Sequence, residues 1–190
     1  MNIVVFGAGG VGGYFGGKLA QAGLSVTFVA RGKHFEAIKN YGLKVKSIQG
    51  DFHVKPEVVN DASQLKEADI IILGVKSWQV QDVAEQIKPI VTENTMVLPL
   101  QNGADNADKL RTVLDDSNVL AGLCKIVSRI ESPGVIDHFA YEPEIVFGEY
   151  DNAKTKRVEQ LSKLFDKAEI NNTISDNIHL DIWKKFLFIA

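Results

Sequence analysis

Short apolar runs and amphipathic stretches alternate along the first two thirds of the chain. Runs that are apolar on both faces predict buried strands at 2–6, 24–30, 68–75, 95–98 and 118–123. Between them, apolar residues recur at helical spacing, which predicts helices at 11–22, 34–41, 79–87 and 104–114. This alternation is typical of right-handed βαβ units. The predicted fold class is therefore α/β, a doubly wound and mostly parallel sheet with helices on both faces.

Two other regions depart from this alternation. Residues 43–58 alternate loosely around a glycine turn at 49–51, which predicts a hairpin. After residue 123, short strands are expected at 125–130, 135–140 and 144–148, with turns at 132–134 and 141–143. These strands predict an antiparallel meander at the edge of the sheet. A helix at 152–168, a strand at 170–174 and a terminal helix capped by Asp176 complete the prediction.

A glycine-rich loop follows the first predicted strand and opens the first predicted helix. Its sequence fits G-x-G-x-x-G, the fingerprint of a Rossmann-type dinucleotide site when it stands in this context. Gly7 allows a tight turn, Gly9 lets a pyrophosphate approach the backbone, and Gly12 lets helix and strand pack closely. The alternative is a glycine-rich turn without a ligand. The predicted pyrophosphate site comprises Gly7, Ala8, Gly9, Gly10, Val11 and Gly12.

The residues after the second predicted strand indicate which dinucleotide is bound. NAD sites usually place an acid there to bind the ribose 2′-hydroxyl. This chain has no acidic residue from Gly7 to Phe35, and Arg31 stands at the expected place. A guanidinium can hold a 2′-phosphate, and Lys76 after the 68–75 strand adds a second positive charge. The sequence therefore predicts NADP(H), the alternative being that both cations are solvated surface charges.

Two further positions are candidates for chemistry. Asn102 follows the strand at 95–98, where ligands bind in open α/β sheets, although it could equally cap the next helix. Lys185 shares a helical face with Ile178, Ile182 and Ile189. Burial there would lower the pKa of the ammonium and make it a proton donor. The alternative is that the side chain extends to water, where its pKa would not be lowered. Lys184 also has apolar neighbours, so spacing alone does not choose between the two lysines.

Composition excludes several classes of protein. The 190 residues are 45% hydrophobic with a formal net charge of −3, which argues against disorder and against nucleic-acid binding. No apolar run is long enough to span a membrane. The histidines lack metal-ligand spacing, so no metal site is expected. Cys124 is the one cysteine and is expected in the core, which together with the other features indicates a reducing, cytoplasmic compartment.

Taken in order, the motifs resemble those of the ketopantoate reductases, or 2-dehydropantoate 2-reductases. The matching segments are Gly7-Ala8-Gly9-Gly10-Val11-Gly12-Gly13, Ala30-Arg31-Gly32, Val75-Lys76, Gln101-Asn102-Gly103, Ser132-Pro133-Gly134 and Trp183-Lys184-Lys185. The resemblance spans the chain. It implies NADPH-dependent reduction of ketopantoate to pantoate, in the biosynthesis of pantothenate and coenzyme A.

The same resemblance implies a role for each matched residue. Residues 7–12 would bind the pyrophosphate, and Arg31 and Lys76 the 2′-phosphate. Asn102 would lie near the nicotinamide ribose and the substrate, and Lys185 would donate the proton.

The family also has a helical carboxyl-terminal domain that supplies a serine and a glutamate to the substrate. We therefore expect an NADP-binding domain at 1–170, with 171–190 the start of the helix leading into a missing domain, and little activity from this part alone. The apolar end of that helix would then be exposed and predicts a homo-oligomer. Ile189 stands where many members have asparagine, which allows another 2-keto acid as substrate. The alternatives are a non-catalytic NADPH sensor and, more remotely, a flavin enzyme.

Overall fold

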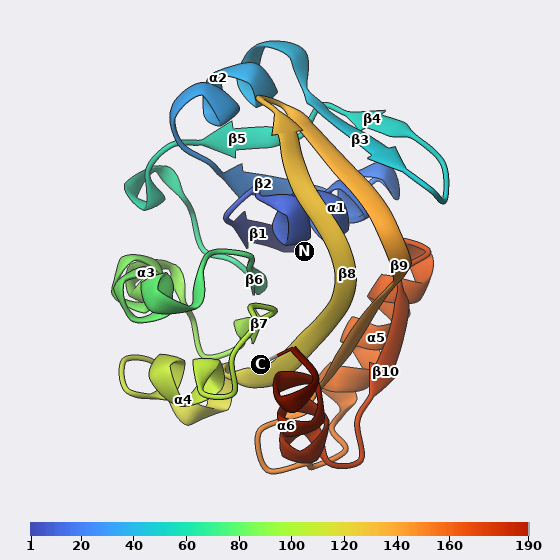
Figure 1. Ribbon diagram of the computed structural model, residues 1–190. Coiled ribbons are helices and arrows are strands. Elements are labelled where there is room, and N and C mark those ends of the chain that lie inside the picture. Colours follow the sequence, from blue (N-terminus) through green and yellow to red (C-terminus); the bar gives the residue numbers. More distant parts are fainter. Residues whose placement is uncertain (190) are drawn as a thin grey trace.

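The computed structural model describes residues 1–189 and contains two sheets (Figure 1). The first sheet is entirely parallel, with strand order β5-β2-β1-β6-β7. Its strands are β1 (Asn2–Phe6), β2 (Ser25–Val29), β5 (Glu57–Val59), β6 (Ile70–Leu73) and β7 (Met96–Pro99). The helices are α1 (Gly10–Gln21), α2 (Gly32–Tyr41), α3 (Val80–Ile87), α4 (Asn106–Arg111), α5 (Lys156–Lys167) and α6 (Ile178–Ile189).

Both faces of the first sheet are buried, which explains why its strands are apolar throughout. On one face Val5 packs in a cluster with Phe15 of α1, and on the other Val4 packs with Val83 of α3. Figure 1 shows α3 and α4 on one side of this sheet, with α1 and the second sheet on the other. The predicted α/β, doubly wound, Rossmann-type architecture is confirmed.

The second sheet has the order β10-β9-β3-β4, with β8 paired to β9. Its strands are β3 (Leu43–Ser47), β4 (Phe52–Val54), β8 (Leu120–Ser132), β9 (Val135–Glu149) and β10 (Asn171–Ile174). The β3–β4 hairpin is confirmed, but residues 57 and 58, at the end of the predicted hairpin region, belong to β5, which pairs with β2 in the first sheet.

The region after residue 119 is a single long hairpin of the second sheet, rather than three short strands at the edge of the first. Most of the separate strand predicted at 118–123 is the beginning of β8. β8 and β9 are antiparallel, as predicted, and turn at Pro133-Gly134. The predicted turn at 141–143 is wrong, because β9 runs through it. The pairing moves from Lys125 opposite Glu144 to Val127 opposite Ala140, so one residue of β8 faces three of β9. Such a bulge lets turn-forming residues remain in a continuous strand, and Tyr141 has a φ of 63° there.

The N-cap of the carboxyl-terminal helix is Asn177, one residue later than the predicted cap Asp176. Asn177 accepts the N–H of Leu180, whereas Asp176 forms an ion pair with Lys154. β10 joins the second sheet and α6 packs against β8 and β9. The domain boundary at residue 170 stays a prediction, and Ala190 lies outside the described residues.

Several large apolar side chains of α6 are exposed, as its sequence predicted. Phe188 is 82% exposed, Leu187 73% and Trp183 52%. Self-association through this surface stays a prediction. Within residues 1–189, no helix has both the length and the apolar character needed to cross a membrane.

Candidate active site

The carboxyl ends of four adjacent strands bring the predicted site residues to one edge of the first sheet. In spatial order, Arg31 follows β2, the glycine loop follows β1, Lys76 follows β6 and Asn102 follows β7. Three strand intervals separate the first from the last, a span of roughly 14 Å. The chain order changes direction between β1 and β6, and ligands bind at such a switch point in open α/β sheets.

Glycines form the tightest part of this edge. Gly7 has a φ of +100°, and a Cβ there would lie 2.9 Å from the backbone nitrogen of Val75. A Cβ on Gly12 would overlap the carbonyl oxygen of Gly7, and one on Gly74 would lie 2.9 Å from the Cα of Gly12. Gly74 was not singled out from the sequence, although it occupies the same position after β6 that Gly7 occupies after β1.

Gly9 differs from these glycines because the space beside it is open. A Cβ there would meet only the carbonyl oxygen of Gly74, at 3.9 Å, and its backbone is extended (φ −74°). No side chain caps α1 at Gly9, so the first N–H groups of the helix are left for another acceptor. An open backbone surface at a helix N-terminus fits the pyrophosphate of a dinucleotide.

Replacing Gly12 with alanine is expected to destabilise the fold by about 1–3 kcal/mol, because the added methyl group would overlap the backbone carbonyl of Gly7. The free energy of unfolding from urea titration measures this effect. Gly23→Ala gives a comparison, since a Cβ there has nothing within 4 Å and only the positive φ is strained. A Gly12→Ala protein as stable as wild type would contradict the close packing of α1 on Gly7.

Arg31 and Lys76 are both exposed, so either can reach a ligand from its strand end. The guanidinium of Arg31 donates a long hydrogen bond, 3.4 Å, to Oε1 of Gln86 on α3. The pKa of the Asp61 carboxyl is lowered, mainly by hydrogen bonds from Ser63. The positive charge of Arg31 lowers it further. The structure places Arg31 and Lys76 just after β2 and β6, as predicted.

Lys185 and Asn102 meet at the far end of the row, 83 residues apart in sequence. Nζ of Lys185 donates to Oδ1 of Asn102 at 2.8 Å. Lys185 is half-buried and Lys184 is exposed. Spacing did not distinguish the two lysines, but in the structure it is Lys185 that lies against Asn102.

The surroundings of Lys185 disfavour its charged form. Burial lowers the pKa of the ammonium, Cys124 acts in the opposite direction, and the positive charge of Lys125 lowers it further. Cys124 itself is buried, as predicted. Its thiol donates to the carbonyl oxygen of Leu100 at 3.4 Å, and burial raises its pKa to about 11. A thiol held in this form is a poor nucleophile.

The loop that carries Asn102 is held by Asn106, which sequence reasoning missed. The Nδ2 of Asn106 lies within hydrogen-bond distance of the carbonyl oxygens of Gln101, Asn102 and Gly103, at 3.1, 3.3 and 3.4 Å. Asn106 therefore fixes the backbone, and the side chain of Asn102 points to Lys185 instead of capping a helix. A second asparagine four residues after Asn102 was the available signal.

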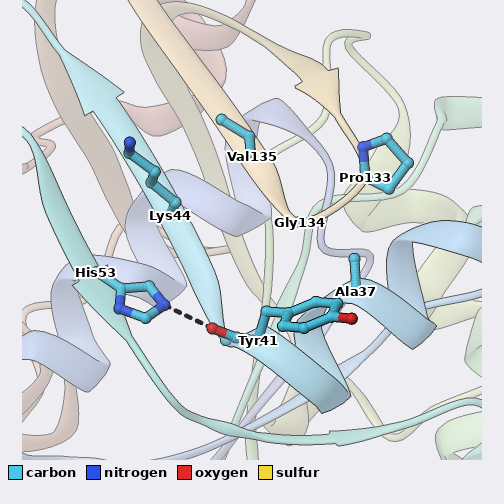
Figure 2. Close-up of a pocket in the computed structure, with 8 residues that line it drawn as sticks. Ala37, Tyr41, Lys44, His53, Pro133, Gly134 and Val135 are labelled. Atoms are coloured by element: carbon cyan, nitrogen blue, oxygen red, sulfur yellow. Dashed lines mark hydrogen bonds between the residues drawn. The ribbon is translucent and has the colours of Figure 1, made fainter.

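A separate hollow of about 410 Å³ lies between α2, the β3–β4 hairpin and the β8–β9 turn (Figure 2). Its walls include Ala37, Val135 and Pro133, and Nε2 of His53 donates to the carbonyl oxygen of Tyr41 at 2.7 Å. It contains none of the predicted site residues. In the described part of the chain, no three histidine, cysteine or acidic residues form a group that could hold a metal ion.

Comparisons with known proteins identify a family for this chain. The family model of ketopantoate reductase PanE/ApbA matches residues 3–152. The chain belongs to this family. Its members include oxidoreductases named 2-dehydropantoate 2-reductase, one of which, from Pyrococcus abyssi (strain GE5 / Orsay), is 34% identical over 185 residues, 97% of this chain and 60% of that protein.

Two further relatives extend the comparison. The uncharacterized oxidoreductase YkpB of Bacillus subtilis (strain 168) is 36% identical over 190 residues, all of this chain and 62% of that protein. The crystal structure of 2-dehydropantoate 2-reductase from Porphyromonas gingivalis W83 superposes with a TM-score of 0.94 at 35% identity, covering 100% of this chain and 69% of that one. The chain thus spans about three fifths of the length of the curated relatives.

One solved relative is described with a reduced nicotinamide cofactor. It is a ternary structure of D-mandelate dehydrogenase with NADH and anilino(oxo)acetate, with a TM-score of 0.88 at 26% identity over 97% of this chain and 60% of that one. The chain therefore shares its fold with a protein whose structure was solved with NADH.

Proposed function

We propose that the chain is the cofactor-binding part of an NADPH-dependent reductase that converts ketopantoate to pantoate, in the route to pantothenate and coenzyme A. The observation that carries this proposal is the hydrogen bond from Lys185 to Asn102 at the carboxyl end of β7. It places an ammonium at one end of the row of strand ends, with the 2′-phosphate candidate Arg31 at the other end and Lys76 between them, after the strand next to β7. We also propose a cytoplasmic location, since Cys124 is a buried free thiol.

The residues at this end of the row supply the proton. A bound NADPH supplies the hydride for the keto carbon. Asn102 accepts one N–H of Lys185 and so holds the ammonium in place, which leaves its other N–H groups for the keto oxygen. As negative charge develops on that oxygen, Lys185 donates a proton, the alkoxide becomes a hydroxyl, and the neutral amine regains its proton from water.

Keto-acid reduction is expected to slow as the pH rises through the pKa of Lys185, because only the ammonium can donate. Burial puts that pKa below the usual 10.5 of a lysine, so the loss should begin before an ordinary lysine would titrate. The pH profile of kcat/KM from neutral to alkaline solution measures it. A rate that stays constant until ordinary lysines titrate would contradict a buried lysine donor.

We assign the cofactor preference to Arg31 and Lys76. In an Arg31→Ala variant, NADPH affinity is expected to fall about 10- to 100-fold, the size of a charge-assisted hydrogen bond lost. NADH affinity should change little, because NADH has no 2′-phosphate. Isothermal titration with both cofactors measures the difference.

Lys33→Ala provides the matched control, since Lys33 is an exposed cation two residues from Arg31. Its loss should leave the NADPH/NADH ratio close to that of wild type. Equal affinity of the wild-type chain for the two cofactors would overturn the assignment of NADP.

A further inference from the structure

His34, in the first turn of α2, connects two backbone segments that are far apart in sequence. Its Nε2 lies 2.7 Å from the carbonyl oxygen of Ala8 in the glycine loop. On the other side of the ring, the backbone N–H of Gly134 donates to Nδ1 at 3.0 Å. Gly134 is in the turn between β8 and β9, so the imidazole joins the loop to the long hairpin.

These two partners determine the form of the ring. Because the N–H of Gly134 can only donate, Nδ1 must carry a lone pair. The carbonyl oxygen of Ala8 can only accept, so Nε2 must carry the hydrogen. Both requirements are met by the neutral Nε2–H tautomer alone. Burial favours the same form, since it lowers the pKa of His34 more than the Ala8 hydrogen bond raises it.

The bond to Ala8 also sets the direction of a donor in the glycine loop. The carbonyl of Ala8 and the N–H of Gly9 belong to one planar trans peptide, in which the two groups point in opposite directions. A donor that holds the carbonyl therefore fixes where the N–H of Gly9 points. Gly9 is the open position of the loop, with nothing but the carbonyl oxygen of Gly74 near its missing Cβ.

His34 also lies on the same helix as the candidate 2′-phosphate group. Arg31 is the N-cap of α2, three residues before His34. The imidazole thus anchors the start of α2 to the glycine loop. Arg31 and the glycine loop, which face the 2′-phosphate and the pyrophosphate in the proposed site, are therefore held in a fixed relative position.

We propose that His34 is a positioning residue of the dinucleotide site, which orients the Ala8–Gly9 peptide toward the pyrophosphate and braces the loop against the β8–β9 turn. This inference rests on the proposed function, because it assigns His34 a part in binding the same cofactor. His34 itself acts through the backbone and contacts no phosphate.

Two isosteres of histidine separate the two bonds. A glutamine can place its side-chain N–H near the position of Nε2 and keep the bond to Ala8, while an asparagine reaches only as far as Nδ1 and keeps an acceptor for Gly134. His34→Gln is therefore expected to bind NADPH close to wild-type affinity. His34→Asn and His34→Ala should bind it about tenfold more weakly or worse.

His53→Ala serves as the matched control. His53 also donates from Nε2 to a backbone carbonyl, that of Tyr41, but it lies in the hollow of Figure 2, away from the glycine loop. NADPH dissociation constants and melting temperatures are measured for all variants, well below the lowest melting temperature. A purely structural role would lower the melting temperature and leave the dissociation constant of the folded protein unchanged.

The NADPH dissociation constants of these variants decide whether His34 orients the glycine loop. Weak binding by His34→Asn, recovery in His34→Gln and no change in His53→Ala support the inference. Equal NADPH affinity of wild type, His34→Gln and His34→Asn overturns it even if His34→Ala fails to fold, and so does equally weak binding by the Gln and Asn variants. If the wild-type chain binds neither NADPH nor NADH, the proposed function fails, whereas binding that is insensitive to residue 34 defeats only the present inference.

Discussion

Replacing Lys185 with methionine is expected to lower the rate of ketopantoate reduction by about 10²- to 10⁴-fold, the usual contribution of a general acid. Methionine keeps the length and apolar contacts of the side chain but cannot protonate the developing alkoxide. NADPH affinity should remain near that of wild type, because the glycine loop lies two strand intervals from β7 and Arg31 three. Single-turnover rates and cofactor dissociation constants, measured on the longest form of the protein that carries this chain, separate the two effects.

Lys184→Met is the control for this experiment. Lys184 precedes Lys185 on α6 and is exposed, so its loss removes the same charge from the same helix without touching Asn102. Its reduction rate should match wild type. If Lys185→Met turns over normally, the proton comes from another group. If Lys185→Met binds NADPH more weakly but keeps the wild-type single-turnover rate when saturated with NADPH, Lys185 serves binding rather than proton transfer. A wild-type protein that binds NADPH without reducing any keto acid would point to a sensor.

Replacing Gly9 with alanine is expected to weaken NADPH binding by about 10- to 100-fold while leaving stability almost unchanged. The methyl group would meet only one protein atom, at 3.9 Å, and the extended backbone at Gly9 suits alanine. It would, however, occupy the space through which a pyrophosphate approaches the helix N-terminus, and overpacking of this kind costs about 1–3 kcal/mol. Titration calorimetry and urea unfolding of one protein sample measure both quantities.

Comparison with Gly12→Ala separates an effect on NADPH binding from an effect on stability. The two glycines are three residues apart in one motif, yet Gly12 contacts the backbone of Gly7 and Gly9 faces open space. Alanine at 12 should therefore reduce stability, and alanine at 9 should reduce binding. A Gly9→Ala protein that binds NADPH as tightly as wild type would exclude pyrophosphate contact at Gly9.

Local features of the sequence were enough to predict four of the five strands of the first sheet and most of its edge, whereas β5 was expected in a hairpin. Strands buried on both faces need continuous apolar runs, which are visible in the sequence. In a parallel sheet the carboxyl ends of these runs all lie at the same edge. The glycine loop, Arg31, Lys76 and Asn102 could therefore be assigned to one edge before their distances were known. The three-strand meander failed because turn-forming residues at 141–143 are also compatible with a bulge, and only the partner strand selects between the two.

What the sequence alone determined is the α/β class, the row of strand ends and the chemical types of the residues along it, since these depend on local propensity and on the regular geometry of parallel strands. The tertiary structure decided which lysine faces Asn102, that Gly74 packs against Gly12, and that His34 joins Ala8 to Gly134. Each of these is a contact between segments that are distant in the chain. Such contacts depend on how α2, α6 and the β8–β9 hairpin pack against the sheet, which no local pattern encodes.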